Sequence, residues 1–411
     1  MFAKLALRSL QDRKGSVLLS IMAMIVSIFV LLGVEHIRHQ AKQSFTNSVS
    51  GVDLIVGAKT GSLNLLLYSI FRVGTPTNNI SWQSFQKISK SPKVKWAVPI
   101  ALGDSHQGYR VLGTNRDYFT HFSYARQRYL EFYQGQAFTQ VFDLVLGADV
   151  AKKLGYELGD NIVLAHGIAN TSFSMHDSMP FTVVGILAPT GTPVDQSLHV
   201  SLQGIEAIHN RGQTFDKFSS SGLDQPLLQP KAITAFMLGL TSKVTTFQVQ
   251  RNINRYAQEP LMAILPGVAV SELWQMMSWI ENTLLLVSVL VFIAGCLGVS
   301  AMLLSSIRER DKEIQLLRVI GASPGFLFLL IELEAFFMTL FSLITASTLL
   351  FVSLVLAQDY LVTHFGLHIS VNIFSISSFY LMMSIVITSI VVAMIPSFIG
   401  YKQSNSKKTI H

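Results

Sequence analysis

The chain has 411 residues, of which half are apolar and only 13% are charged. Soluble domains usually carry about 25% charged residues, so this deficit argues against an ordinary soluble protein and indicates a membrane protein. The formal net charge of +7 would suit nucleic acid or an anionic lipid surface, but the basic residues gather beside long apolar runs, which favours lipid and no nucleic acid.

The opening residues 1–15 resemble a short amphipathic helix. Phe2, Leu5 and Leu10 share one stripe, while Lys4 and Arg8 lie off it. Such a helix can lie in the cytoplasmic membrane interface beside anionic lipid. A simple positively charged flank of a membrane span would have the same composition, and both interpretations stay open.

Four stretches each contain an uncharged run that is long enough to cross a bilayer as a helix, which takes about 20 residues. We expect transmembrane helices over residues 16–34, 282–307, 325–357 and 373–400. The first is interpreted as a retained anchor, because it is long for the apolar core of a signal peptide and no cleavage pattern of small residues follows it. Soluble helices are rarely apolar all round over such lengths, which disfavours four buried helices of a soluble fold.

The basic residues beside these stretches predict the orientation of the chain. Clusters of Lys and Arg precede the first span, separate the second from the third and follow the fourth, whereas residues 358–372 contain neither. Because loops rich in Lys and Arg stay in the cytoplasm, both termini (1–15 and 401–411) and the loop 308–324 are predicted to be cytoplasmic. Residues 35–281 and the short loop 358–372 are then periplasmic.

The segment 35–281 is long enough for one or two compact α+β lobes. Residues 181–187 and 233–240 have the composition of strands, with a shorter strand near 161–165. Residues 81–89, 148–154, 202–209 and 243–257 favour helices, and 213–231 a loop. The apolar segment 61–71 could be core, or a surface helix that contacts lipid or an apolar substrate. The single cysteine, Cys296, lies in a predicted span, so this segment has no disulfide and no cysteine-rich zinc site.

Motifs of common enzymes are missing. A phosphate-binding Walker A loop requires a Gly-Lys dipeptide, and the chain has none. The nucleophile motif Gly-x-Ser-x-Gly and the zinc motif His-Glu-x-x-His are absent too. We therefore expect no catalytic residues, no metal and no directly bound cofactor.

The loop 308–324 carries the most informative pattern. It predicts a charged helix with favourable pairs three residues apart, such as Arg310 and Glu313, before Gly321 and Pro324 end it. A rigid helix tied to two spans could transmit motion from a docked partner. A solvated helical turn between two spans would be the plainer interpretation.

This loop resembles the Glu-Arg-x-x-Glu-Ile-x-x-x-Arg-x-x-Gly-Ala motif of the MacB/LolC/FtsX superfamily of ABC permeases. The matching residues are Glu309, Arg310, Glu313, Ile314, Arg318, Gly321 and Ala322. The start at 6–16, the MacB-like stretch 146–160 with 181–187, and Glu334-Ala335 also resemble the superfamily. The C-terminal end at 395–402 follows it only loosely, and 50–77 and 213–231 match nothing in it.

The resemblance implies that residues 308–324 couple the chain to a separate ABC-type ATPase, so that ATP acts only through that partner. It implies a MacB-like periplasmic domain over 35–281 between the first two spans, and a bacterial inner-membrane location. It also implies a second permease chain, either identical or related, contact with membrane lipid, and room for a periplasmic partner protein.

Two smaller groups of residues remain open. Glu332 and Glu334 stand near the start of the third span, where we expect the membrane interface rather than the bilayer centre; a role in closing a dimer is the alternative. Several periplasmic residues could bind zinc or copper, although their spacing matches no known site and ordinary surface histidines are the expected outcome. They are His166, His176, Asp177, His199 and His209.

Three functions are compatible with these sequence features. The favoured one is a mechanotransmission permease that exports or extracts a lipoprotein, peptide or toxic small molecule. The alternative is an FtsX-like signalling scaffold that controls a periplasmic partner without transport. A membrane-anchored binding module without an ATPase is disfavoured by the coupling motif.

Overall fold

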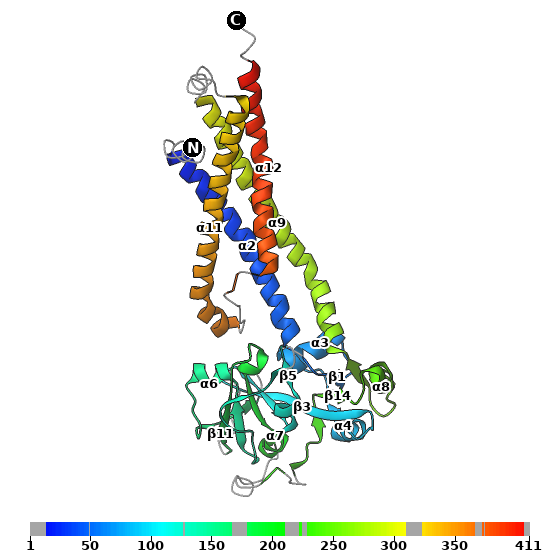
Figure 1. Cartoon of the computed structure of the whole chain (residues 1–411). Coiled ribbons are helices and arrows are strands. Elements are labelled where there is room, and N and C mark those ends of the chain that lie inside the picture. The colour runs from blue at the N-terminus through cyan, green and yellow to red at the C-terminus, as the bar shows by residue number, and fades with distance from the viewer. Residues whose placement is uncertain are drawn as a thin grey trace. The chain divides into compact units, whose positions relative to one another are not determined.

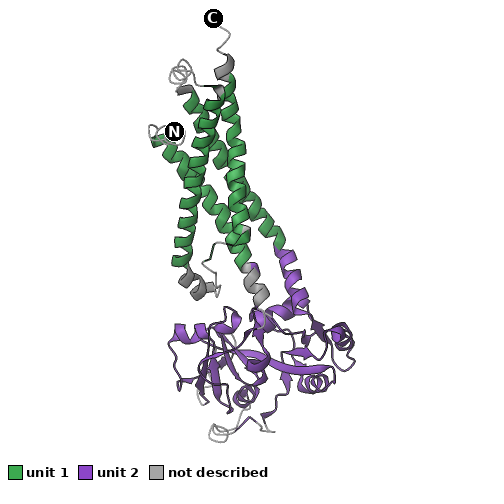
Figure 2. Cartoon of the chain, viewed as in Figure 1, with its two compact units in different colours: residues 1–41, 278–360, 369–411 green, residues 42–277, 361–368 purple. Residues whose placement is uncertain are grey.

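A computed structural model describes residues 14–48, 50–125, 128–166, 179–209, 222–223, 228–309, 323–365, 372–373 and 375–406. Figure 1 labels the helices and strands. The chain divides into two compact units, coloured in Figure 2: unit 1 is residues 1–41, 278–360 and 369–411, and unit 2 is residues 42–277 and 361–368.

Unit 1 is built from the greater part of four long helices: α2 (Lys14–Asn47), α9 (Pro266–Glu309), α11 (Pro324–Phe365) and α12 (Ile376–Ser406). Each contains an apolar segment of 22 residues or more that could cross a membrane. The prediction of four helices that are long and apolar enough to cross a membrane is therefore confirmed.

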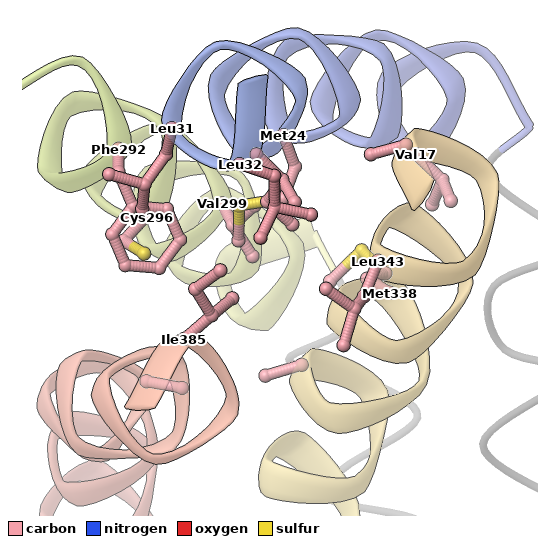
Figure 3. Packing of buried hydrophobic residues seen from close by; sticks show 14 of the residues in the cluster. Val17, Met24, Leu31, Leu32, Phe292, Cys296, Val299, Met338, Leu343 and Ile385 are labelled. Atoms are coloured by element: carbon pink, nitrogen blue, oxygen red, sulfur yellow. The ribbon is translucent and has the colours of Figure 1, made fainter. Parts of the chain in front are cut away.

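One stripe of each helix faces its neighbours. In α9 the buried residues Phe292, Cys296, Val299 and Leu303 recur every three or four positions, whereas Leu297 between them is 53% exposed. Figure 3 shows Phe292, Cys296 and Val299 near Leu31 and Leu32 of α2 and Ile385 of α12. The remaining apolar faces are left for lipid.

Unit 2 is an α+β domain around one large sheet, as predicted. The strand order is β15-β1-β14-β3-β4-β12-β8-β11-β7, with β10 beside β3 and β9 beside β11. The strands are β15 (Leu261–Ile264), β1 (Leu54–Ala58), β14 (Ala235–Leu240), β3 (Val94–His106), β4 (Tyr109–Thr114), β12 (Ser197–Ser201), β8 (Asp143–Leu146), β11 (Phe181–Leu187), β7 (Phe132–Gly135), β10 (Ala165–His166) and β9 (Asn161–Ile162). The pairs β4–β12 and β8–β11 are parallel, and the other pairs are antiparallel.

Two hydrophobic clusters divide this sheet into the two lobes that the sequence suggested. The first lies under β1, β14 and β15 and includes Phe85, Phe236 and Val249. The second lies under β8, β11 and β12 and includes Leu144, Phe181 and Leu198. The long strand β3 joins the lobes, because residues 94–100 pair with β14 and residues 101–106 pair with β4.

Most predicted elements of this domain are confirmed. Strand β11 has the predicted bounds, and so do α6 (Ala148–Leu154) and α7 (Leu202–His209). Helix α4 (Trp82–Ser89) is capped by Ser81, whose Oγ accepts from Ser84 N at 3.3 Å. The domain also contains a short helix, α5 (Asp117–His121), and the two-residue strands β2 (Ile80–Ser81), β5 (Ser123–Tyr124), β6 (Arg128–Tyr129) and β13 (Ala232–Ile233).

Three predicted elements had wrong bounds. The strand expected near 161–165 is two short strands, because β9 pairs with β11 while β10 pairs with β3. The strand expected over 233–240 is split, because Ile233 pairs with β2 while Ala235 onward pairs with β1 and β3. The helix expected over 243–257 is a 3-10 turn, η5 (Lys243–Thr245), followed by α8 (Thr246–Asn254). It ends early because Asn254 Oδ1 accepts from Ala263 N at 2.7 Å, which turns the chain back into β15.

The apolar segment 61–71 is core rather than a lipid-facing helix. It forms α3 (Ser62–Leu66) and a π-helical turn, η1 (Leu67–Phe71). Leu65, Leu66 and Tyr68 are at most 1% exposed. The alternative of a surface helix for lipid or substrate is therefore wrong.

Candidate functional site

The predicted coupling motif lies between α9 and α11. Glu309 is the last residue of α9, and only its backbone is described. The other six motif residues, Arg310, Glu313, Ile314, Arg318, Gly321 and Ala322, lie outside the described residues. Their role therefore stays a prediction.

The helices on either side of this motif are far longer than a membrane crossing requires. Helix α9 has 44 residues, so it extends roughly 65 Å at 1.5 Å per residue, about twice the hydrocarbon thickness. Its first residue, Pro266, follows the last residue of β15, Ile264, by two positions. One continuous helix thus runs from the motif through an apolar span to a strand of the sheet.

The first helix leads along the chain to the neighbouring strand of the sheet. Helix α2 ends at Asn47, and β1 begins at Leu54. Strands β1 and β15 are hydrogen-bonded neighbours, with Ile55 opposite Ile264. Residue 265 and residues 48–53 therefore connect α9 and α2 to two adjacent strands.

Small and hydroxyl side chains hold the bundle together. A Cβ added at Gly295 of α9 would lie 2.8 Å from Ser27 Oγ of α2, which shows how closely these helices approach. Thr339 of α11 and Ser389 of α12 share a hydrogen bond of 2.5 Å between their hydroxyls. Such contacts hold membrane helices together, because hydrophobic burial does little to favour packed helices over separate helices in lipid.

A charged cluster links α2 to α9. Arg38 pairs with Glu35 of its own helix through two hydrogen bonds of 2.8 and 3.0 Å, and its Nη1 lies 3.9 Å from Glu281 Oε2 of α9. Glu281 immediately precedes the uncharged stretch of α9. This cluster adds a polar link to the apolar packing between the same two helices.

Glu334 is only 3% exposed and shares a face of α11 with the buried residues Ile331, Ala335 and Met338. Its side chain therefore points into the bundle rather than toward lipid. That Glu332 and Glu334 lie at the depth of the membrane interface stays a prediction.

The periplasmic histidines do not form one described ligand set. His199 is fully buried between Tyr118 and Phe119, and burial together with Arg72 lowers its pKa to about 3. His209 instead lies against Asp104, with 3.5 Å between Nε2 and Oδ1. His176, Asp177 and the His166 side chain lie outside the described residues, and no group of three or more potential ligands occurs among those described.

The contact between His209 and Asp104 predicts that the stability of α7 depends on pH. Its Nδ1–H donates to Ile205 O at 2.8 Å, so only the protonated ring can also donate to Asp104, and this bond raises the pKa of His209. The stabilisation is therefore present below the ordinary pKa of about 6.5 and is lost as the pH rises through the raised value. We expect hydrogen-exchange protection of α7 in the full chain to fall over that interval.

The matched variants are His209→Gln and His121→Gln. The first should remove the pH-dependent part of α7 protection, and the second should leave it, because His121 stacks on Trp96 elsewhere in the domain. An unchanged pH profile in His209→Gln would show that the pair with Asp104 does not control α7.

Comparison with known proteins identifies both parts of the chain. A family model described as a MacB-like periplasmic core domain matches residues 17–256, more than half of the chain. A second, described as an FtsX-like permease C-terminal region, matches residues 285–407. No curated protein matches the sequence.

Solved structures of two extracytoplasmic domains are similar to part of the chain. The periplasmic region of MacB from Actinobacillus actinomycetemcomitans has 10% identity and a TM-score of 0.35, and the match covers 55% of this chain and 94% of that one. The extracellular domain of YknZ, a noncanonic ABC-type transporter from Gram-positive bacteria, has 13% identity and a TM-score of 0.29, covering 51% and 98%.

The first family model covers α2 and most of the sheet, and the second covers the spans of α9, α11 and α12. The four helices that are able to cross a membrane and the α+β domain agree with these two family models. The chain belongs to the MacB/FtsX superfamily of ABC-transporter permeases, as a membrane protein with a MacB-like extracytoplasmic domain and an FtsX-like permease region.

Proposed function

We propose that the chain is the permease subunit of a mechanotransmission ABC transporter in the bacterial inner membrane. A separate ATPase binds and hydrolyses ATP, and its closure moves a coupling helix formed by residues 308–324. Helices α9 and α11 transmit that movement across the membrane. The extracytoplasmic domain then exports or extracts a lipoprotein, peptide or toxic small molecule, with a second permease chain completing the complex.

The observation that carries this proposal is the connection of α9 to β15 through a single residue, beside β1, which is the first strand after α2. A shift of α9 along its axis would act on that side of the sheet. A protein that needed only an anchor would not require rigid helices of this length. Unit 2, with its two hydrophobic cores, is also larger than the domain expected of an FtsX-like signalling scaffold, which favours transport.

The orientation in this proposal places both termini and the coupling helix in the cytoplasm. It rests on the three clusters of Lys and Arg that flank the spans, and on their absence from residues 358–372. An ATPase can reach the coupling helix only in this orientation.

Identification of the partner subunit tests the proposal. The tagged chain, purified from native membranes in mild detergent, should bring down a soluble subunit with Walker motifs in about equal amount, detectable by mass spectrometry. Failure to recover any ATPase, even after crosslinking, would contradict the permease assignment. Recovery of a periplasmic hydrolase with the ATPase would instead support the signalling scaffold.

A further inference from the structure

Helices α4 and α8 of unit 2 carry a concentration of positive charge. Residues 82–95, which comprise α4 and the start of β3, contain four lysines and no acidic residue, and residues 243–256, which comprise η5 and α8, contain three basic residues and again no acid. We call these seven the basic face: Lys87, Lys90, Lys93, Lys95, Lys243, Arg251 and Arg255.

The two segments lie together on one lobe. Lys87 Nζ is 5.6 Å from the centre of the Tyr256 ring, and Lys93 Nζ donates to Gln248 Oε1 at 2.7 Å. Their inner sides, with Phe85 of α4 and Val249 of α8, join the same hydrophobic cluster. Figure 1 shows both helices at the same end of the sheet.

No carboxylate neutralises this charge within the described part of the chain. Six of the seven side chains are exposed and Lys93 is half-buried, and none forms an ion pair with a described acidic residue. Glu259, which lies close to α4, accepts hydrogen bonds from the Ser81 backbone and hydroxyl instead. Unpaired like charges repel one another, so an anionic partner would relieve the repulsion.

Two large apolar side chains accompany the basic face. Val244 is 90% exposed and Phe247 is 71% exposed, at the junction of η5 and α8 next to Lys243. The Ser242 side chain accepts from Val244 N and so fixes this turn. Apolar side chains held in water beside cations are typical of surfaces that lie in a membrane interface.

The composition distinguishes between two kinds of anionic partner. Five of the seven cations are lysines, and lysine is depleted at protein–protein interfaces. A diffuse field of lysines instead attracts anionic headgroups. We propose that the basic face binds the anionic headgroups of a lipid bilayer, with Val244 and Phe247 inserted between them.

Vesicle binding tests this inference. The full chain is reconstituted in nanodiscs of phosphatidylcholine and mixed with separate vesicles, made of phosphatidylcholine alone or with added phosphatidylglycerol. Flotation then measures how much protein the vesicles bind. We expect binding only with phosphatidylglycerol, and weaker binding at higher salt, because exposed charges are screened.

A charge-reversal variant tests the residues. Each cation near an anionic surface strengthens binding about fivefold, so Lys90→Glu with Lys243→Glu and Arg251→Glu should lower the partition coefficient at least about a hundredfold. The matched control reverses three exposed cations outside the basic face: Arg116→Glu, Arg128→Glu and Lys152→Glu. It should bind nearly as well as the natural chain. The double variant Val244→Ser with Phe247→Ser should weaken binding less than the charge reversal does, and its binding should still depend on salt.

Three outcomes would overturn the inference. The natural chain could bind neither kind of vesicle, or both equally. The two triple variants could lose binding to the same extent. Finally, salt-sensitive binding to polyglutamate without binding to phosphatidylglycerol would assign the basic face to an acidic polypeptide. Circular dichroism of each variant shows whether a loss of binding reflects unfolding.

Discussion

Glu313→Lys combined with Arg318→Glu is expected to uncouple the permease from its ATPase without unfolding it. Both residues belong to the predicted coupling helix, and reversing both charges leaves the net charge unchanged. An ATPase surface complementary to this helix would then meet like charges, which costs several kcal/mol at an interface. We expect the chain's effect on the activity of its co-purified ATPase to fall by at least about tenfold.

The control is an equal exchange of charge in the extracytoplasmic domain, Lys152→Glu with Glu157→Lys. Both side chains are exposed and border an open surface groove of about 630 Å³ on the second lobe. This variant should retain the natural effect on ATPase activity. Thermal unfolding in the same detergent should be similar for both double variants. Full retention of coupling in the Glu313 and Arg318 variant would refute the assignment of the motif.

The spans could be predicted from sequence because length and lack of charge alone define them. The sequence could not predict which face of each helix turns toward the bundle, since the spans are apolar on every side. Leu297 and Val299 look alike in the sequence, yet the first is 53% exposed and the second 2%. Small and polar residues within the spans, such as Gly295 and Thr339, are the kind of signal that marks contacts between helices.

In the extracytoplasmic domain, too, the sequence predicted some features and missed others. The hydrophobic pattern and the residue composition of short segments predicted β11, α6 and α7, because these signals are local. The pairing of β1 with β15 joins residues about 200 positions apart, and nothing in either strand specifies the other. Asp104, the partner of His209, was missed for the same reason, whereas His199 was grouped with the other histidines although it lies in an aromatic core.

Gly295→Leu is expected to destabilise the full chain by about 1–3 kcal/mol, the usual cost of overpacking. The added side chain would begin 2.8 Å from Ser27 Oγ and 3.2 Å from Ser27 Cβ, so α2 and α9 would have to separate. Ser27 cannot turn away freely, because its hydroxyl donates to Ala23 O at 2.8 Å. Thermal unfolding in detergent measures the loss.

Gly298→Leu is the matched control, three residues along the same helix, where an added Cβ meets nothing within 4 Å. Both substitutions replace glycine by a better helix former, which contributes up to about 1 kcal/mol in each, so the difference between them isolates the contact with α2. The smaller change Gly295→Ala should be rescued by Ser27→Gly, which removes the opposing atoms. Equal stability of the two leucine variants would mean that α2 and α9 do not approach here. The two helices could then slide past each other, and the pairing of β1 with β15 would have to link the movement of α9 to that of α2.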